Sequence, residues 1–162
     1  MIMKVSESLF TVTTEILQVS SSDYLEFIDI TDEVENAITK SGISNGMVVV
    51  FSKHTTSAIV IQENEPLLLE DFKVVIESVA PASGNYLHNN FDIRTVHMHD
   101  DEVPNGHSHC QHLYLGTSET VPIISGKMPL GQWQRIFMVE LDGDKASQVD
   151  FREVVVQIIG QS

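Results

Sequence analysis

Six short runs rich in Val, Ile, Thr and aromatic residues recur along the chain, and they restrict its fold more than any other feature. They lie at 9–19, 46–51, 55–62, 120–124, 133–141 and 149–159. Runs of this length and composition are typical of β-strands. Apolar residues at helical spacing lie at 32–41 and after Asn64, which we expect to cap a helix that opens with Pro66. This order of elements predicts an α+β domain built on mainly antiparallel sheet.

The segment SHCQHLYL (108–115) fits two kinds of secondary structure. A helix would place His109 and His112 on one face, whereas a strand would place His107 and His109 on one face. Ser108 as a cap favours the helix. Two or three helices are therefore expected in all.

Length and composition indicate the class of protein. A chain of 162 residues, of which 42% are hydrophobic, predicts a single domain (1–162) with a substantial core. No apolar run approaches the roughly 18 residues that cross a bilayer, so no membrane partner is expected. The N-terminal segment lacks the layout of a signal peptide, and the single cysteine, Cys110, fits a reducing compartment. These features predict a cytoplasmic protein.

The charge is strongly acidic. The formal net charge is −14, from 23 acidic and 9 basic residues. Such a surface repels a phosphate backbone, so no nucleic-acid partner is expected. Cations and metals are favoured instead, although the same charge also keeps a protein soluble.

Six of the seven histidines lie between residues 88 and 112. Imidazole binds divalent transition metals and also moves protons near pH 7. His88, His107 and His109 are the predicted metal ligands, because three protein ligands with an open position are the pattern of a catalytic zinc site. Zinc is the expected ion, since magnesium prefers oxygen ligands. The alternative is a polar cleft without a metal, because the spacing is neither that of a zinc finger nor HExxH.

Polar residues at the ends of the predicted strands are further candidates. His54 follows the run 46–51 and is a candidate general base or substrate hydrogen-bond partner, unless it is a structural histidine buried on the sheet. Glu63 precedes a helix and is a candidate acid/base or a partner that orients a histidine, unless it serves only as a cap. Gln134 would point into the cleft from the start of a strand.

A phosphate contact is expected near a turn. Lys127 follows a glycine, and with Thr117 and Ser118 it could hold a phosphate through charge-assisted hydrogen bonds. The alternative is an exposed turn lysine. Arg94 and Arg135 are weaker candidates of the same kind.

Several motifs together resemble the YjbQ-like proteins. They are HTTSAIVIQENEPLLLEDF (54–72), GNYLHNN (84–90), DDEVPNGHSH (100–109), LGTS (115–118) and GQWQRIFMVELD (131–142). The resemblance implies a small α+β β-sandwich that assembles as a homotrimer. It also implies the activity of a secondary thiamine-phosphate synthase, which joins the pyrimidine diphosphate and thiazole phosphate halves of thiamine. The partner would then be a small phosphorylated molecule.

Most of the family's motif residues fall on positions already singled out. They are His54, His88, His109, Glu63, Asn64, Trp133 and Gln134, and His107 matches the more common form of its motif. The resemblance therefore implies catalytic roles for His54, Glu63 and Gln134 and a substrate-binding role for Asn64. The alternatives are a metal-dependent hydrolase of a small phosphorylated substrate and a non-catalytic metal- or ligand-binding trimer.

Two stretches depart from the family pattern. Gln132 stands where a small residue is common, and the segment 91–99 is a bulkier insert. His97 and His99 in that insert therefore inherit no role from the resemblance.

Overall fold

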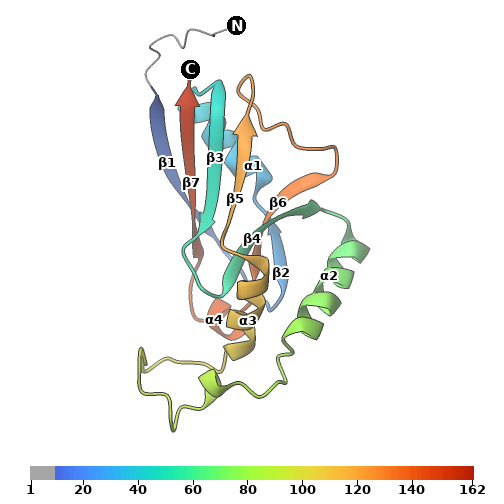
Figure 1. Cartoon of the computed structure of the whole chain (residues 1–162), viewed down its shortest axis with the longest axis vertical. Coiled ribbons are helices and arrows are strands. Elements are labelled where there is room, and N and C mark those ends of the chain that lie inside the picture. The colour runs from blue at the N-terminus through green and yellow to red at the C-terminus, as the bar shows by residue number, and fades with distance from the viewer. Residues whose placement is uncertain (1–9) are drawn as a thin grey trace, which may run out of the picture.

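Two antiparallel sheets lie face to face, and the computed structural model describes residues 10–162 (Figure 1). Leu9, expected to open the first strand, and the N-terminal segment considered for a signal peptide lie outside these residues. The four-stranded sheet has the order β1 (Thr11–Val19), β7 (Arg152–Gln161), β3 (Asn45–Ser52), β5 (Ser118–Ile123). The three-stranded sheet has the order β2 (Glu26–Asp29), β6 (Gln134–Glu140), β4 (Ser57–Glu63). All neighbouring strands are antiparallel, which confirms the expected α+β class.

The alternation of side chains along β7 explains why the sheets face each other. Every second residue from Arg152 to Gly160 is buried, and the residues between them are partly exposed. Successive side chains of a strand point to opposite faces, so this pattern makes one face a core face. Val156 of β7 and Met138 of β6 belong to the same buried cluster between the sheets.

Helices cover the sandwich in two places. Helix α1 (Thr31–Ser41) contributes Val34 and Ile38 to the cluster between the sheets, and Gly42 ends it in the left-handed conformation at φ 70°. Helices α2 (Pro66–Val79) and α3 (Gly106–Leu115) pack on the other face of the three-stranded sheet. The result is three layers: sheet, sheet and helices.

The structure corrects two predicted helix starts. Glu65, not Asn64, caps α2: its carboxylate accepts hydrogen bonds from the amides of Leu67 (3.0 Å) and Leu68 (2.7 Å). Helix α3 is a helix as predicted, but it begins at Gly106, so Ser108 is buried within it and is not a cap.

Three short elements were not predicted from the sequence. These are strand β2, the 3₁₀ turn η1 (Leu87–Asn89) and helix α4 (Gly143–Ala146), where only a turn was expected. With α4 the part of the chain that the structure describes has four α-helices instead of two or three. No helix among residues 10–162 combines the length and the apolar character needed to cross a bilayer.

Candidate active site

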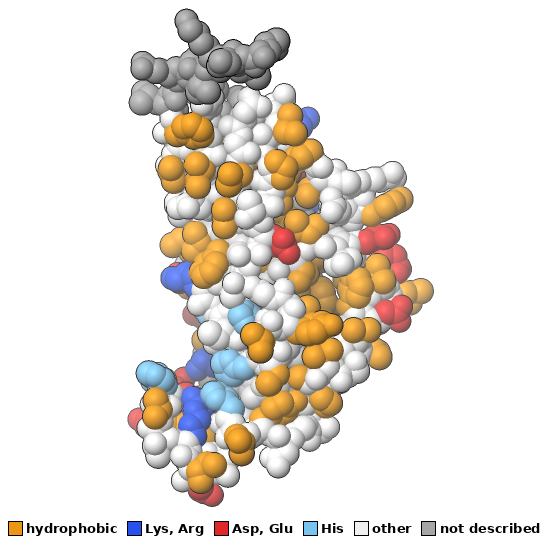
Figure 2. Space-filling model, in the orientation of Figure 1, with side chains coloured by type: hydrophobic (Ala, Val, Ile, Leu, Met, Phe, Trp, Pro, Cys, Tyr) orange, Lys and Arg blue, Asp and Glu red, His pale blue; other side chains and the backbone are white. Residues whose placement is uncertain are grey.

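A cavity of about 590 Å³ lies at the end of the four-stranded sheet where β3 ends and β7 begins. Its walls come from the β3–β4 turn, the segment 88–105, α3, the region of α4 and the start of β7. Its volume falls within the range of small-molecule sites. Figure 2 shows histidine, lysine and arginine side chains gathered in this lower part of the molecule.

Basic side chains and histidines are concentrated in this cavity. The lining includes four of the nine basic residues and five of the seven histidines, but only three of the 23 acidic residues. The basic residues are Lys53, Arg94, Lys145 and Arg152, and the histidines are His54, His88, His97, His99 and His109. An acidic protein has therefore gathered four of its nine permanently cationic side chains around one hollow, which favours an anion there.

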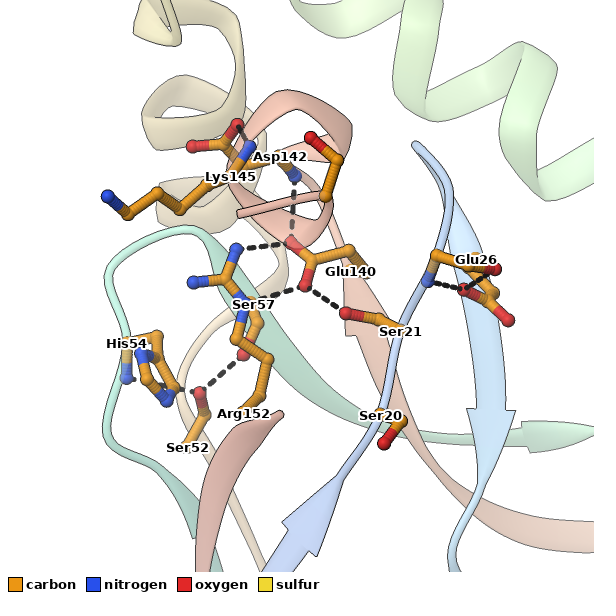
Figure 3. Close-up of polar contacts among 12 residues, drawn as sticks. Ser20, Ser21, Glu26, Ser52, His54, Ser57, Glu140, Asp142, Lys145 and Arg152 are labelled. Carbon is orange, nitrogen blue, oxygen red and sulfur yellow. Dashed lines mark hydrogen bonds and ion pairs between the residues drawn. The ribbon is translucent and has the colours of Figure 1, made fainter. Parts of the chain in front are cut away.

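A buried ion pair positions Arg152. Glu140 is fully buried and Arg152 is 4% exposed. The carboxylate of Glu140 accepts hydrogen bonds from Nε (2.6 Å) and Nη2 (2.8 Å) of Arg152 and from the hydroxyl of Ser21 (2.8 Å). The third nitrogen of the guanidinium points away from Glu140 in Figure 3. Two-point pairing of this kind fixes the plane of the guanidinium as well as its position.

Asp142 joins three of the elements around the cavity. Its amide donates to Glu140 (2.9 Å), its Oδ1 caps α4 by accepting from the amide of Lys145 (3.0 Å), and its Oδ2 accepts from Asn105 (2.7 Å) at the start of α3. The residue is 2% exposed. A single buried residue thus holds the end of β6, α4 and α3 together, through its amide and its carboxylate.

The segment 88–105 is held by one ion pair within it and by another that joins it to α4. Arg94 Nη1 lies 2.9 Å from Glu102, and both side chains are largely buried. Arg94 also donates to the carbonyl of His97 (3.0 Å). Lys145 of α4 pairs with Asp101. These contacts hold Arg94 and Lys145 on the lining of the cavity.

His88 and His109 lie side by side. Their ring centroids are 4.6 Å apart at 69°, with His88 on η1 and His109 in the second turn of α3. Burial, followed by the neighbouring imidazole of His88, lowers the pKa of His109. Both effects favour the neutral form of the His109 imidazole.

His54 is held by the backbone. Its Nε2 accepts a hydrogen bond from the amide of Glu153 (2.9 Å), and its own amide donates to the hydroxyl of Ser52 (3.3 Å). Ser52 in turn shares a hydrogen bond of 2.7 Å with Ser57 (Figure 3). Burial, and then the charge of Arg152, lowers the pKa of His54.

The structure brings together three of the predicted site histidines and separates the fourth. His54, His88 and His109 all line the cavity. His107 packs instead against Tyr24 (5.3 Å between ring centroids) and Tyr86 (6.3 Å), and it does not line the cavity. No group of three or more histidine, cysteine or acidic side chains arranged to hold a metal occurs in the described range.

The other predicted site residues lie elsewhere in the chain. Glu63 and Gln134 face each other across the β4–β6 ladder, at the end of β4 that is remote from Ser57 and the cavity. Gln134 accepts from the amide of Gly131 (2.8 Å), and Asn64 donates to Asp29 (3.0 Å). None of these side chains lines the cavity.

The three residues predicted to hold phosphate are also outside the cavity lining. Thr117 and Ser118 lie at the start of β5, where the carbonyl of Thr117 accepts from the amide of Ser52 (2.9 Å). Lys127 lies in the turn after β5, next to a separate surface hollow near Glu35 of α1. Arg94, ranked as a weaker candidate, does line the cavity.

Four residues of the cavity lining were not predicted from the sequence: Lys53, Lys145, Arg152 and Asp142. The sequence contained a signal for Arg152. Every second residue of the last strand is buried, and Arg152 lies on the same face of that strand as Val154 and Val156. A charged residue at a core position implies a buried partner. The partner, Glu140, ends another apolar run.

Known proteins match the chain over most of its length. The sequence profile described as "UPF0047 protein YjbQ-like" matches residues 15–161. A "UPF0047 protein" of Methanothermobacter thermautotrophicus is 42% identical over 85% of this chain and 89% of its own length. Another from Archaeoglobus fulgidus is 37% identical over 82% of this chain and 94% of its own length.

Solved structures show the same fold. A YbjQ-like protein of unknown function from Sulfolobus solfataricus matches with a TM-score of 0.82 at 35% identity, covering 94% of this chain and 100% of that one. A member of the yjbq/upf0047 family from Clostridium acetobutylicum matches with a TM-score of 0.68 at 32% identity, covering 91% of this chain and 98% of that one.

Proposed function

The chain belongs to the UPF0047 YjbQ-like family, and from this premise we propose that its cavity binds a small phosphorylated substrate and transfers a pyrimidine group onto a thiazole phosphate. This is the reaction of a secondary thiamine-phosphate synthase. The proposal rests on one observation: four basic residues and five histidines line a single cavity, although the chain has a net charge of −14.

The proposed reaction needs charge stabilisation more than proton transfer. The thiazole nitrogen forms a bond to the methylene carbon of the pyrimidine, and the bond from that carbon to the diphosphate oxygen breaks. The diphosphate leaves with the bonding electrons, and the thiazole nitrogen becomes cationic. Groups that bind the departing oxygens favour this step. Arg94, Lys145 and Arg152 are placed for that role, with His88 and His109 as hydrogen-bonding partners.

A homotrimer is part of the proposal, supported by the outer face of the four-stranded sheet. Val12, Ile16, Met47 and Phe51 point outward there and are 59%, 51%, 46% and 41% exposed. Figure 2 shows apolar side chains spread over this face. Exposed apolar patches of this kind mark protein interfaces. We propose that copies of the chain cover this face.

Assembly also gives a role to the predicted residues outside the cavity. Glu63, Asn64 and Gln134 lie at the far end of the three-stranded sheet. Thr117 lies just before β5, Ser118 begins that strand, and Lys127 follows it. In this proposal these six residues contact a substrate only when the trimer places them beside the cavity of a neighbouring copy. Their catalytic and substrate-binding roles therefore depend on the trimer.

The contact between His88 and His109 favours one alternative, a metal-assisted hydrolase of a small phosphorylated substrate. Within residues 10–162 the two imidazoles lack the third donor of a catalytic zinc site, because His107 packs against Tyr24. The donor set of one chain thus does not complete a zinc site, and the proposed transfer relies on the basic side chains of the cavity.

A turnover assay tests the proposal. Purified protein is incubated with the pyrimidine diphosphate and thiazole phosphate, with and without EDTA, and thiamine phosphate is measured. We expect turnover that survives EDTA and falls in Arg94→Met. Arg135→Met is the matched control, since Arg135 pairs with Asp29 away from the cavity. Release of inorganic phosphate that EDTA abolishes would favour the hydrolase, and ligand binding without turnover would favour a binding protein.

A further inference from the structure

The ring of His54 completes the ladder between β3 and β7. The amide of Lys53 donates to the carbonyl of Glu153 (3.2 Å), as in a regular antiparallel rung. The amide of Glu153 donates to Nε2 of His54 (2.9 Å). In a regular rung the acceptor would be the carbonyl of Lys53. An imidazole nitrogen has taken the place of a backbone carbonyl.

This contact determines where the imidazole carries its proton. A nitrogen that accepts a hydrogen bond has no hydrogen of its own, so the proton of the neutral ring lies on Nδ1. Protonation of Nε2 would set two N–H groups against each other. Burial, Arg152 and Lys53 lower the pKa of His54 and outweigh the opposite effects of Glu140 and Glu153.

The Nδ1 proton is available to a ligand. His54 is half-buried and lines the cavity, and among residues 10–162 Nδ1 has no hydrogen-bond partner. The only lone pair of the ring is occupied by the Glu153 amide. The ring can therefore donate to a ligand, and it has no free lone pair with which to take a proton.

We propose that His54 binds an oxygen of the substrate's phosphate as a neutral donor through Nδ1–H and does not act as a general base. This inference rests on the proposed phosphate-binding function of the cavity. His54 is then a substrate-binding residue whose tautomer is set by the backbone amide of Glu153 in β7. Any proton transfer at this site then falls to another group on the cavity lining, such as His109.

Nitrogen-15 NMR of the histidine side chains at pH 7 tests the inference, with inorganic phosphate as the probe. We expect Nε2 of His54 to show the shift of an unprotonated nitrogen and Nδ1 that of a protonated one. Saturating phosphate should move the Nδ1 proton and leave Nε2 unprotonated. A protonated Nε2, or phosphate binding that leaves the Nδ1 proton unmoved, would overturn the inference alone. Failure of the wild-type protein to bind phosphate would overturn the proposed function as well.

A pair of variants isolates the backbone contact. Glu153→Pro removes the amide hydrogen, while Glu153→Ala keeps it, and both lose the ion pair with Lys53. Arg152 is extended, which suits a residue before proline. We expect the alanine variant to keep the Nδ1–H tautomer and the proline variant to populate both tautomers and bind phosphate less tightly. The same tautomer in both folded variants would contradict the inference, and the wild-type spectrum decides the matter if the proline variant does not fold.

Discussion

Glu140 and Arg152 form a two-point ion pair inside the protein, with oxygen–nitrogen distances of 2.6 and 2.8 Å. The pair joins the last residue of β6 to the first residue of β7 and so connects the two sheets at the cavity. It places a permanently charged guanidinium on the cavity wall without exposing it to bulk water. The core and the candidate site therefore share these two residues.

Loss of Glu140 alone should be severely destabilising. Glu140→Leu leaves the buried charge of Arg152 without a partner, and we expect the free energy of unfolding to fall by about 3–5 kcal/mol. The double variant Glu140→Leu/Arg152→Met removes both charges and should lose less. Urea denaturation of both proteins measures the difference. A single variant at least as stable as the double variant would contradict this assignment.

The cap of α2 gives a second stability prediction. Glu65→Ala removes the acceptor for the amides of Leu67 and Leu68, and it should cost about 1 kcal/mol of stability. Asn64→Ala removes only an exposed contact with Asp29 and should cost less. Thermal unfolding of the two variants measures the difference. A larger loss of stability in Asn64→Ala than in Glu65→Ala would show that Asn64 is the capping residue.

The apolar outer face of the four-stranded sheet should determine the state of assembly. Light scattering after size exclusion should give the mass of a trimer for the wild-type protein. Met47→Lys places a charge on this face and should give a monomer. Leu67→Lys, at an exposed position of α2 away from this face, is the control and should remain a trimer. A monomeric wild-type protein would refute this part of the proposal.

Stability should fall as the pH decreases through the range in which histidines titrate. Burial is the main cause that lowers the pKa values of His54, His107, His109 and His112 below the ordinary 6.5. The unfolded chain therefore binds protons at a higher pH than the folded chain, and stability is lost as pH falls below about 6.5 towards the lowered values. Urea titrations at pH 7.5, 6.5 and 5.5 measure the trend. If stability stays constant or rises as the pH is lowered from 7.5 to 5.5, the pKa values of these histidines are not lowered in the folded protein.

The sequence predicted much of the fold because its strongest signals are local. The alternation in the last strand and the helical spacing of Val34 and Ile38 both report a buried face directly. Elements of three or four residues, such as β2 and α4, contain too few residues to show a period. Their positions depend on contacts with distant segments, such as the pairing of β2 with β6.

The candidate site was predicted less completely. Histidine density pointed to the segment that lines the cavity, and the strand end pointed to His54, because both are properties of short stretches. His107 and His109 were predicted to bind one metal, but two positions along a helix turn a side chain by about 200°, so His107 faces Tyr24 instead. The meeting of Arg94, Lys145 and Arg152 depends on tertiary structure that no single stretch reveals.

The central claim is that this cavity binds phosphate groups, and calorimetric titration with inorganic pyrophosphate tests it most directly. Wild-type protein and Arg135→Met should bind with similar affinity, because Arg135 pairs with Asp29 and Asp32 away from the cavity. Arg94→Met and Lys145→Met should each bind about tenfold more weakly, as expected for loss of a charged hydrogen bond. A wild-type protein that does not bind pyrophosphate, or equal affinities for Arg94→Met and Arg135→Met, would contradict the account.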